Sequence, residues 1–93
     1  MITRMWEARA ADADALAEAM LAGLPTGADG YAGGDVYRSL DQPGLVVVIT
    51  NWRDEAALAA YAGEGWRTRA DDAPVPLVEG EAHVWHFAPI GPR

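Results

Sequence analysis

The sequence predicts an α+β fold in which two helices cover one face of a four-stranded antiparallel sheet. Three observations support this prediction. Residues 2–9 alternate as a strand does, and residues 45–50 form a short β-branched run. An alanine-rich segment with apolar side chains at helical spacing follows each of these two strands. The Asp-Gln-Pro-Gly turn at residues 41–44 joins the two predicted middle strands as a hairpin.

The first strand and first helix are predicted from two different periods. Along residues 2–9, one set of side chains is expected on each face of the strand. These sets are Ile2, Arg4, Trp6 and Ala8 on one face, and Thr3, Met5, Glu7 and Arg9 on the other. A helix is predicted from residue 11 or 12 to about Leu24, and Pro25 ends it. Its apolar stripe consists of Leu16, Met20, Leu21 and Leu24.

The second strand is predicted over residues 31–40. The Gly33-Gly34 pair within it predicts a bulge or a close approach of another backbone. The third strand is predicted over residues 45–50. It leads into a corner at residues 51–54 that carries Trp52.

A second helix is predicted to follow Asp54 and to run to residue 62. The Asp54 carboxylate is a good N-cap, Glu55 suits the positive end of the helix dipole, and Gly63 ends the helix. Residues 64–76 are predicted to be irregular, with one helical turn near residues 66–70. A fourth strand is predicted within residues 77–88.

The resulting order, β-α-β-β-α-β, is that of the split βαβ or ferredoxin-like unit. The third strand is apolar on both faces, and the fourth carries Val84 on one face and Trp85 and Phe87 on the other. Because two helices cover only one face of such a sheet, something else must cover the second face. We expect a second copy of the chain there, which predicts a homodimer packed sheet to sheet.

The composition excludes several classes of protein. A chain of 93 residues that is 51% hydrophobic indicates one folded domain spanning residues 1–93. A net charge of −7 argues against nucleic acid and anionic membranes as partners. The absence of cysteine excludes a disulfide framework and a thiolate metal site. No signal peptide or long apolar run is evident, so we expect a cytoplasmic protein.

Three segments carry a resemblance to a known family: MITRMWEARA, VYRSLDQPGLVVVITNWRDEAALAAYAGEGW and HVWHF. Together they resemble the antibiotic biosynthesis monooxygenase family of the dimeric α+β barrel superfamily. This resemblance implies a cofactor-independent monooxygenase that uses molecular oxygen on a small aromatic or polyketide-like substrate.

Cofactor-free oxygenation uses the substrate as its own reductant. The protein must supply a dry apolar pocket, aromatic walls, a base and a donor that stabilises the substrate anion. His86 and His83 have the ordinary pKa that suits the base, and they lie on opposite faces of the predicted fourth strand. The resemblance favours His86 as the catalytic histidine. The alternative is a buried or interface histidine with a structural role.

The remaining candidates are mainly aromatic. The resemblance implies that Trp52 lines the active-site cavity, and core packing at the corner is its alternative. Tyr61 either donates a hydrogen bond in the site or fills space. An indole can stack on a planar substrate, although such side chains also pack in cores. The further candidates for substrate binding are Trp6, Trp66, Asn51 and His83.

The chain departs from the quinone-forming members that it resembles at two positions. Val48 stands where they carry an Asn, and Leu58 where they carry a Tyr, with Tyr61 one helical turn away. No metal or other cofactor is expected, because two histidines on opposite strand faces do not form a coordination sphere. Two alternatives stay open: a cofactor-free cyclase or isomerase, and a non-catalytic dimer that binds a small hydrophobic ligand.

Overall fold

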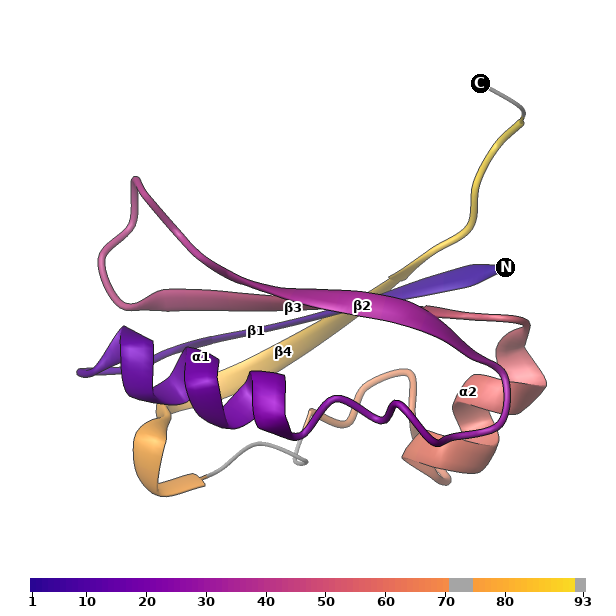
Figure 1. Cartoon of the computed structure of the whole chain (residues 1–93), viewed down its shortest axis with the longest axis horizontal. Helices are drawn as coiled ribbons and strands as arrows, with labels where there is room; N and C mark the ends of the chain where they lie inside the picture. Colours follow the sequence, from indigo (N-terminus) through magenta and orange to yellow (C-terminus); the bar gives the residue numbers. More distant parts are fainter. Residues whose placement is uncertain (71–74, 92–93) are drawn as a thin grey trace.

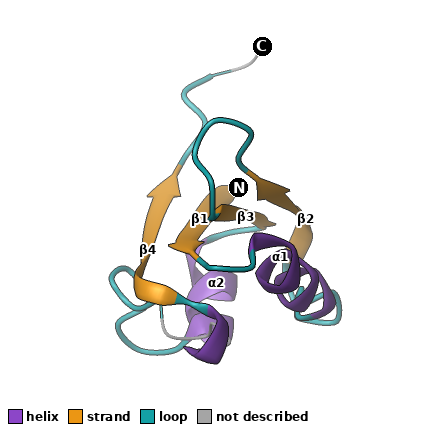
Figure 2. Cartoon of the chain, turned by 90° about the vertical axis from the view of Figure 1, so that its left-hand side faces the viewer, coloured by secondary structure: helices purple, strands orange, loops and turns teal. Residues whose placement is uncertain are grey.

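The computed structural model describes residues 1–70 and 75–91 (Figure 1). One sheet has the strand order β2-β3-β1-β4, with every neighbouring pair antiparallel. Both helices lie on the same side of it (Figure 2), which confirms the predicted fold class. The elements are β1 (Ile2–Arg9), α1 (Ala13–Ala22), β2 (Tyr31–Arg38), β3 (Leu45–Trp52), α2 (Glu55–Ala62), the 3₁₀ turn η1 (Val75–Leu77) and β4 (Glu79–Phe87). No helix in the described part of the chain is long and apolar enough to cross a membrane.

The alternation predicted for β1 is confirmed. The side chains of one set are all buried on the face that the helices cover, which we call the inner face: Ile2, Arg4, Trp6 and Ala8. The helix α1 begins after Asp12, whose side chain accepts a hydrogen bond from the Ala15 N–H at 3.0 Å. It ends at Ala22, two residues before the predicted end, and Leu24 still packs against the core.

The glycine pair in β2 has the predicted effect. The register with β3 shifts between Tyr31 and Gly34, so the strand is irregular there. A Cβ atom on Gly34 would lie 2.6 Å from the Ile49 carbonyl oxygen, which only glycine avoids. The strand ends at Arg38, two residues earlier than predicted.

The strand β3 is two residues longer than predicted, which corrects the position of the corner. Asn51 and Trp52 pair with Thr3 and Ile2 on β1, so the ladder continues through both residues. The turn therefore begins at Arg53. Trp52 is the last residue of a strand, and its side chain direction follows from the alternation of that strand.

The helix α2 has the predicted bounds. The Asp54 carboxylate accepts a hydrogen bond from the Ala57 N–H at 2.8 Å, and this bond lowers the pKa of Asp54. Gly63 follows the helix with a φ of 87°, as the predicted stop requires. One turn at residues 64–68 stands in place of the predicted turn at 66–70, and the prediction for residues 71–74 lies outside the described residues.

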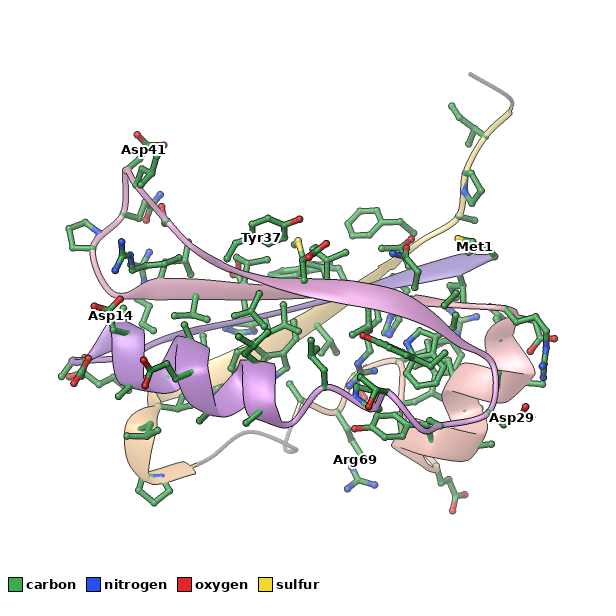
Figure 3. All side chains as sticks on the ribbon, in the orientation of Figure 1. Met1, Asp14, Asp29, Tyr37, Asp41 and Arg69 are labelled. Atoms are coloured by element: carbon green, nitrogen blue, oxygen red, sulfur yellow. The ribbon has the colours of Figure 1, made fainter. Side chains whose placement is uncertain are left out.

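The two faces of the sheet differ in what covers them. The inner face packs on α1 and α2 through two buried clusters, one around Trp6 and Leu16 and one around Trp52 and Leu58. On the opposite face, which we call the outer face, Tyr37 points away from the helices (Figure 3). The outer face also carries the half-exposed side chains of Trp85 and Phe87.

Candidate functional site

A cavity of about 340 Å³ lies between the inner face of the sheet and the helices. The end of α1, the loop after it, the inner faces of β1 and β3, and one residue of α2 form its walls. The described residues that line it are Arg4, Trp6, Ala19, Met20, Gly23, Leu24, Pro25, Val48, Thr50, Trp52 and Tyr61.

The sheet register explains how these side chains meet. Arg4 pairs with Thr50, and Trp6 pairs with Val48, in adjacent rows of the β1–β3 ladder. Because every second residue of a strand faces the same side, all four side chains point to the inner face. The polar pair Arg4–Thr50 therefore lies between the apolar pair Trp6–Val48 and Trp52, which occupies the next row on the other side.

Aromatic rings form much of the wall. The Trp52 side chain is 1% exposed, and its Nε1 donates a hydrogen bond to Thr50 Oγ1 at 3.0 Å. Tyr61 stacks on Trp52 with 5.0 Å between ring centroids and 29° between planes. Trp6 Nε1 donates to the Ala70 carbonyl oxygen at 3.3 Å. Since both indole N–H groups have partners, these rings are held in place in the cavity wall.

Arg4 is the one charged side chain among the described lining residues. It is only 6% exposed, and its guanidinium donates hydrogen bonds to three other described residues, among its partners. Its Nη1 donates to the Trp66 carbonyl oxygen at 2.9 Å and to His86 Nε2 at 3.1 Å, and its Nη2 donates to the Arg69 carbonyl oxygen at 2.9 Å. A permanent cation is thus fixed in the cavity wall.

His86 lies behind Arg4 and is not among the residues that line the cavity. A guanidinium only donates, so Nε2 of His86 must accept, which assigns the proton of the neutral ring to Nδ1. Burial lowers the pKa of His86 first, the charges of Arg4 and then Arg67 lower it further, and Glu55 opposes them. The Trp66 ring meets the imidazole edge to face at 4.7 Å.

This contact predicts a titration. We expect the NMR midpoint of His86 to lie below the ordinary histidine pKa of about 6.5, and Arg4→Gln to raise it. The unfolded state takes up this proton more readily than the folded state. The free energy of unfolding should therefore be highest above about pH 6.5 and should fall as the pH falls from there toward the lower pKa of the folded state. The Cε1–H resonances, assigned with His83→Gln, measure the midpoint. A midpoint above 6.5 would contradict a pKa lowered by burial and by the charge of Arg4.

The structure separates the sequence candidates into three groups. Trp6, Trp52 and Tyr61 line the cavity, and His86 and Trp66 meet behind Arg4. Asn51 and His83 lie on the outer face. There, the Thr3 hydroxyl donates to Asn51 Oδ1 at 2.7 Å, and the His83 ring lies 5.8 Å from the Trp85 ring. The sheet itself therefore stands between these last two side chains and the cavity.

The structure also shows where the two residues lie at which the chain departs from the quinone-forming members. Val48 lines the cavity beside Trp6, and Leu58 is fully buried beside Trp52 in the core. Sequence reasoning missed Arg4 and Thr50 as lining residues. The available signal was the period of β1, which puts an arginine on the same face as Ile2 and Trp6. Among residues 1–70 and 75–91, no three histidine, aspartate or glutamate side chains lie close enough to hold a metal ion.

Several solved structures are similar to this chain over nearly its whole length. A candidate antibiotic biosynthesis monooxygenase from Deinococcus radiodurans has a TM-score of 0.77 at 20% identity and covers 100% of this chain and 96% of its own. One from Nitrosomonas europaea has a TM-score of 0.74 at 16% identity, covering 98% of this chain and 100% of its own. A variant of SnoaB, a cofactor-independent oxygenase from Streptomyces nogalater, has a TM-score of 0.71 at 20% identity, covering 98% and 94%.

These structural similarities show a shared fold. No curated protein sequence matches the chain. The family model described as antibiotic biosynthesis monooxygenase matches residues 1–71, which is most of the sequence and includes β1, both helices and β3. The predicted resemblance is therefore confirmed, and the chain belongs to the antibiotic biosynthesis monooxygenase family.

Proposed function

We propose that the chain is a cofactor-independent monooxygenase that acts on a small aromatic molecule in the cavity between the sheet and the helices. The observation that carries this proposal is the wall of Trp6, Trp52 and Tyr61 around about 340 Å³ of space. This volume is at the small end of ligand pockets, about 300–1,000 Å³, and suits a ligand of two or three fused rings. The similarity to SnoaB, a cofactor-independent oxygenase, supports the proposed reaction class.

The proposed chemistry uses the substrate as electron donor. A phenol or anthrone ionises in the cavity, and its anion passes one electron to oxygen, after which the two radicals combine as a peroxide. Loss of water then leaves a carbonyl, so that a CH₂ group and O₂ become C=O and H₂O. The aromatic walls stack the ring and exclude bulk water, which strengthens the electrostatic interactions that stabilise the anion.

We propose different roles for Tyr61 in the cavity wall and for His86 behind Arg4. Tyr61 is the lining residue whose hydroxyl we propose as the proton donor to the peroxide, while the substrate releases its own proton to solvent. His86 acts through Arg4, because its accepting Nε2 holds the guanidinium against the cavity. The neutral imidazole that the contact requires is consistent with the lowered pKa of His86.

The first experiment measures binding and turnover together. Anthrones, naphthols and hydroquinones are titrated into the protein, and indole fluorescence and substrate absorbance are followed in air and under nitrogen. We expect saturable quenching in both atmospheres, and conversion only in air with one atom of ¹⁸O₂ in the product. Naphthalene, which has no ionisable oxygen, is the control that should bind without conversion.

Two outcomes would overturn the oxygenase proposal in favour of the alternatives. Conversion that continues under nitrogen would indicate a cyclase or isomerase. Saturable quenching without conversion of any compound in the panel would indicate a protein that binds a hydrophobic ligand without catalysis.

The outer face supports a homodimer as part of the proposal. Ile49, Met5 and Trp85 stand side by side in one row across β3, β1 and β4. Tyr37 and Phe87 flank this row and are each 52% exposed, and the row ends on β2 at the exposed Asp35, so the apolar surface lies over β3, β1 and β4. Both helices lie on the inner face, and no other described segment covers this row. We propose that the outer faces of two copies pack against each other around a two-fold axis.

A further inference from the structure

The Thr50 hydroxyl is a buried polar group in the wall of the cavity. Thr50 lies on the inner face of β3, is 8% exposed and is among the described residues that line the cavity. Its methyl group lies toward β2, since a Cβ atom on the paired Gly34 would stand 3.1 Å from Thr50 Cγ2. Its hydroxyl oxygen accepts a hydrogen bond from Trp52 Nε1 at 3.0 Å. Contacts on both branches therefore set the rotamer of this side chain.

The bond from Trp52 determines what the Thr50 hydroxyl can still do. An indole N–H only donates, so Thr50 Oγ1 is the acceptor, and its own O–H remains available to donate. The polar side chains beside it, Trp52 and Arg4, carry only donors, so neither can take this proton. No other residue in the described part of the chain accepts it. Because a buried donor without an acceptor is costly, we expect water or a ligand atom in the cavity to receive the proton.

A carbonyl oxygen on an aromatic ring system fits this donor. The rows on either side of Thr50 are apolar, with Trp6 and Val48 in one and Trp52 in the other. A flat ligand can pack its rings against these side chains and direct one oxygen to the hydroxyl. A hydrocarbon of the same shape would displace water from the hydroxyl without replacing the lost hydrogen bond. The hydroxyl can thus distinguish the two compounds.

We propose that Thr50 is a specificity-determining residue of the cavity, whose hydroxyl donates a hydrogen bond to a carbonyl oxygen on the ring system of the ligand. The inference rests on the proposed function in taking the cavity as the substrate site. It also supplies a donor for the proposed reaction, because ionisation of an anthrone moves negative charge onto its carbonyl oxygen. The hydrogen bond from Thr50 therefore becomes stronger as the substrate anion forms.

The first test compares two compounds of nearly equal shape under nitrogen. Fluorenone carries a carbonyl oxygen on its central ring, and fluorene carries a CH₂ group there. Equilibrium dialysis gives the Kd of each, and the ratio of the two values is compared between proteins. We expect Thr50→Val, which keeps the shape of the side chain and loses the hydroxyl, to shift this ratio against fluorenone by about tenfold. Thr50→Ser keeps a hydroxyl and should retain the wild-type ratio.

Thr3→Val is the matched control for this test. It makes the same chemical change on the outer face, where the Thr3 hydroxyl donates to Asn51. It should therefore leave the ratio of the two Kd values unchanged. Circular dichroism checks that each variant is folded. The same ratio in the wild type and in a folded Thr50→Val protein would overturn the inference.

The second test needs no variant, so it holds even if Thr50→Val does not fold. Fluorenone labelled with ¹³C at its carbonyl is bound to the wild-type protein. We expect its infrared carbonyl band at a lower frequency than in cyclohexane, because a hydrogen bond weakens the C=O bond. We also expect NMR contacts between the Thr50 methyl group and the ring hydrogens beside the carbonyl. A band at the cyclohexane frequency, or contacts with the hydrogens of the opposite edge instead, would overturn the inference.

The two proposals fail in different ways. Conversion of anthrones in air, with a Kd ratio that Thr50→Val leaves unchanged, would support the oxygenase and exclude the role of Thr50. A Kd ratio that depends on the Thr50 hydroxyl, without conversion of any compound, would support the role of Thr50 and exclude the oxygenase.

Discussion

Replacing Trp52 with alanine is expected to lower the free energy of unfolding by about 3–5 kcal/mol and to abolish ligand binding. Trp52 is the largest fully buried side chain of the chain's described part, at 1% exposure. Its ring meets Tyr61 face to face and Tyr31 edge to face, and its Nε1 donates to Thr50. Removing it would leave a void between the second core cluster and the cavity, so both packing and ligand contact are lost at once.

Circular dichroism in urea measures the stability, because removing an indole changes the fluorescence signal itself. Trp52→Phe separates the two effects, since a phenyl ring keeps the stacking on Tyr61 but loses the hydrogen bond to Thr50. We expect that variant to fold and to bind ligand more weakly. Leu21→Ala is the control, because Leu21 is exposed on α1. A fully stable Trp52→Ala protein would show that this ring does not hold the core together.

The sequence predicted the elements well wherever a local rule decides them. The period of two on β1 predicted which side chains are buried, because a strand exposes its two faces alternately. Asp54 and Gly63 predicted both ends of α2, because a carboxylate cap and a positive-φ glycine act through backbone groups nearby in the chain. These rules need no knowledge of what packs on the element.

The site was harder to predict because it depends on which face of a strand each residue occupies and on segments that are distant in the sequence. Ending β3 at Thr50 made Asn51 and Trp52 neighbours at one corner, whereas in a continuous strand they must face opposite sides. His83 and His86 were correctly placed on opposite faces. The position of His86 behind Arg4 depends on the turn at residues 64–68, which supplies the Trp66 carbonyl. The cavity itself exists because α1 ends at Ala22, and helix ends are fixed only to within a few residues by sequence.

Replacing Ile49 with aspartate is expected to convert the proposed dimer into a monomer. Ile49 lies at the centre of the outer face, next to Met5 in the β1–β3 ladder and one strand from Trp85. In a two-fold interface each substitution occurs twice, so two carboxylates would be buried without cationic partners, each beside the Asp35 carboxylate that pairs with position 49 across β2 and β3. We expect dimer affinity to fall by about a thousandfold or more, which corresponds to about 4 kcal/mol.

Analytical ultracentrifugation over a range of concentrations measures this change, and circular dichroism checks that the variant is folded. Leu21→Asp is the control, since it adds the same charge to the exposed surface of α1, on the side of the sheet that the helices cover. It should leave the mass of the proposed dimer unchanged. The cavity lies between the inner face of the sheet and the helices, on the side opposite Ile49. A folded Ile49→Asp monomer should therefore still bind naphthols, which distinguishes an effect on assembly from an effect on ligand binding. A wild-type protein that sediments as a single chain at every concentration would contradict the proposed dimer, and the apolar outer face would then need another partner.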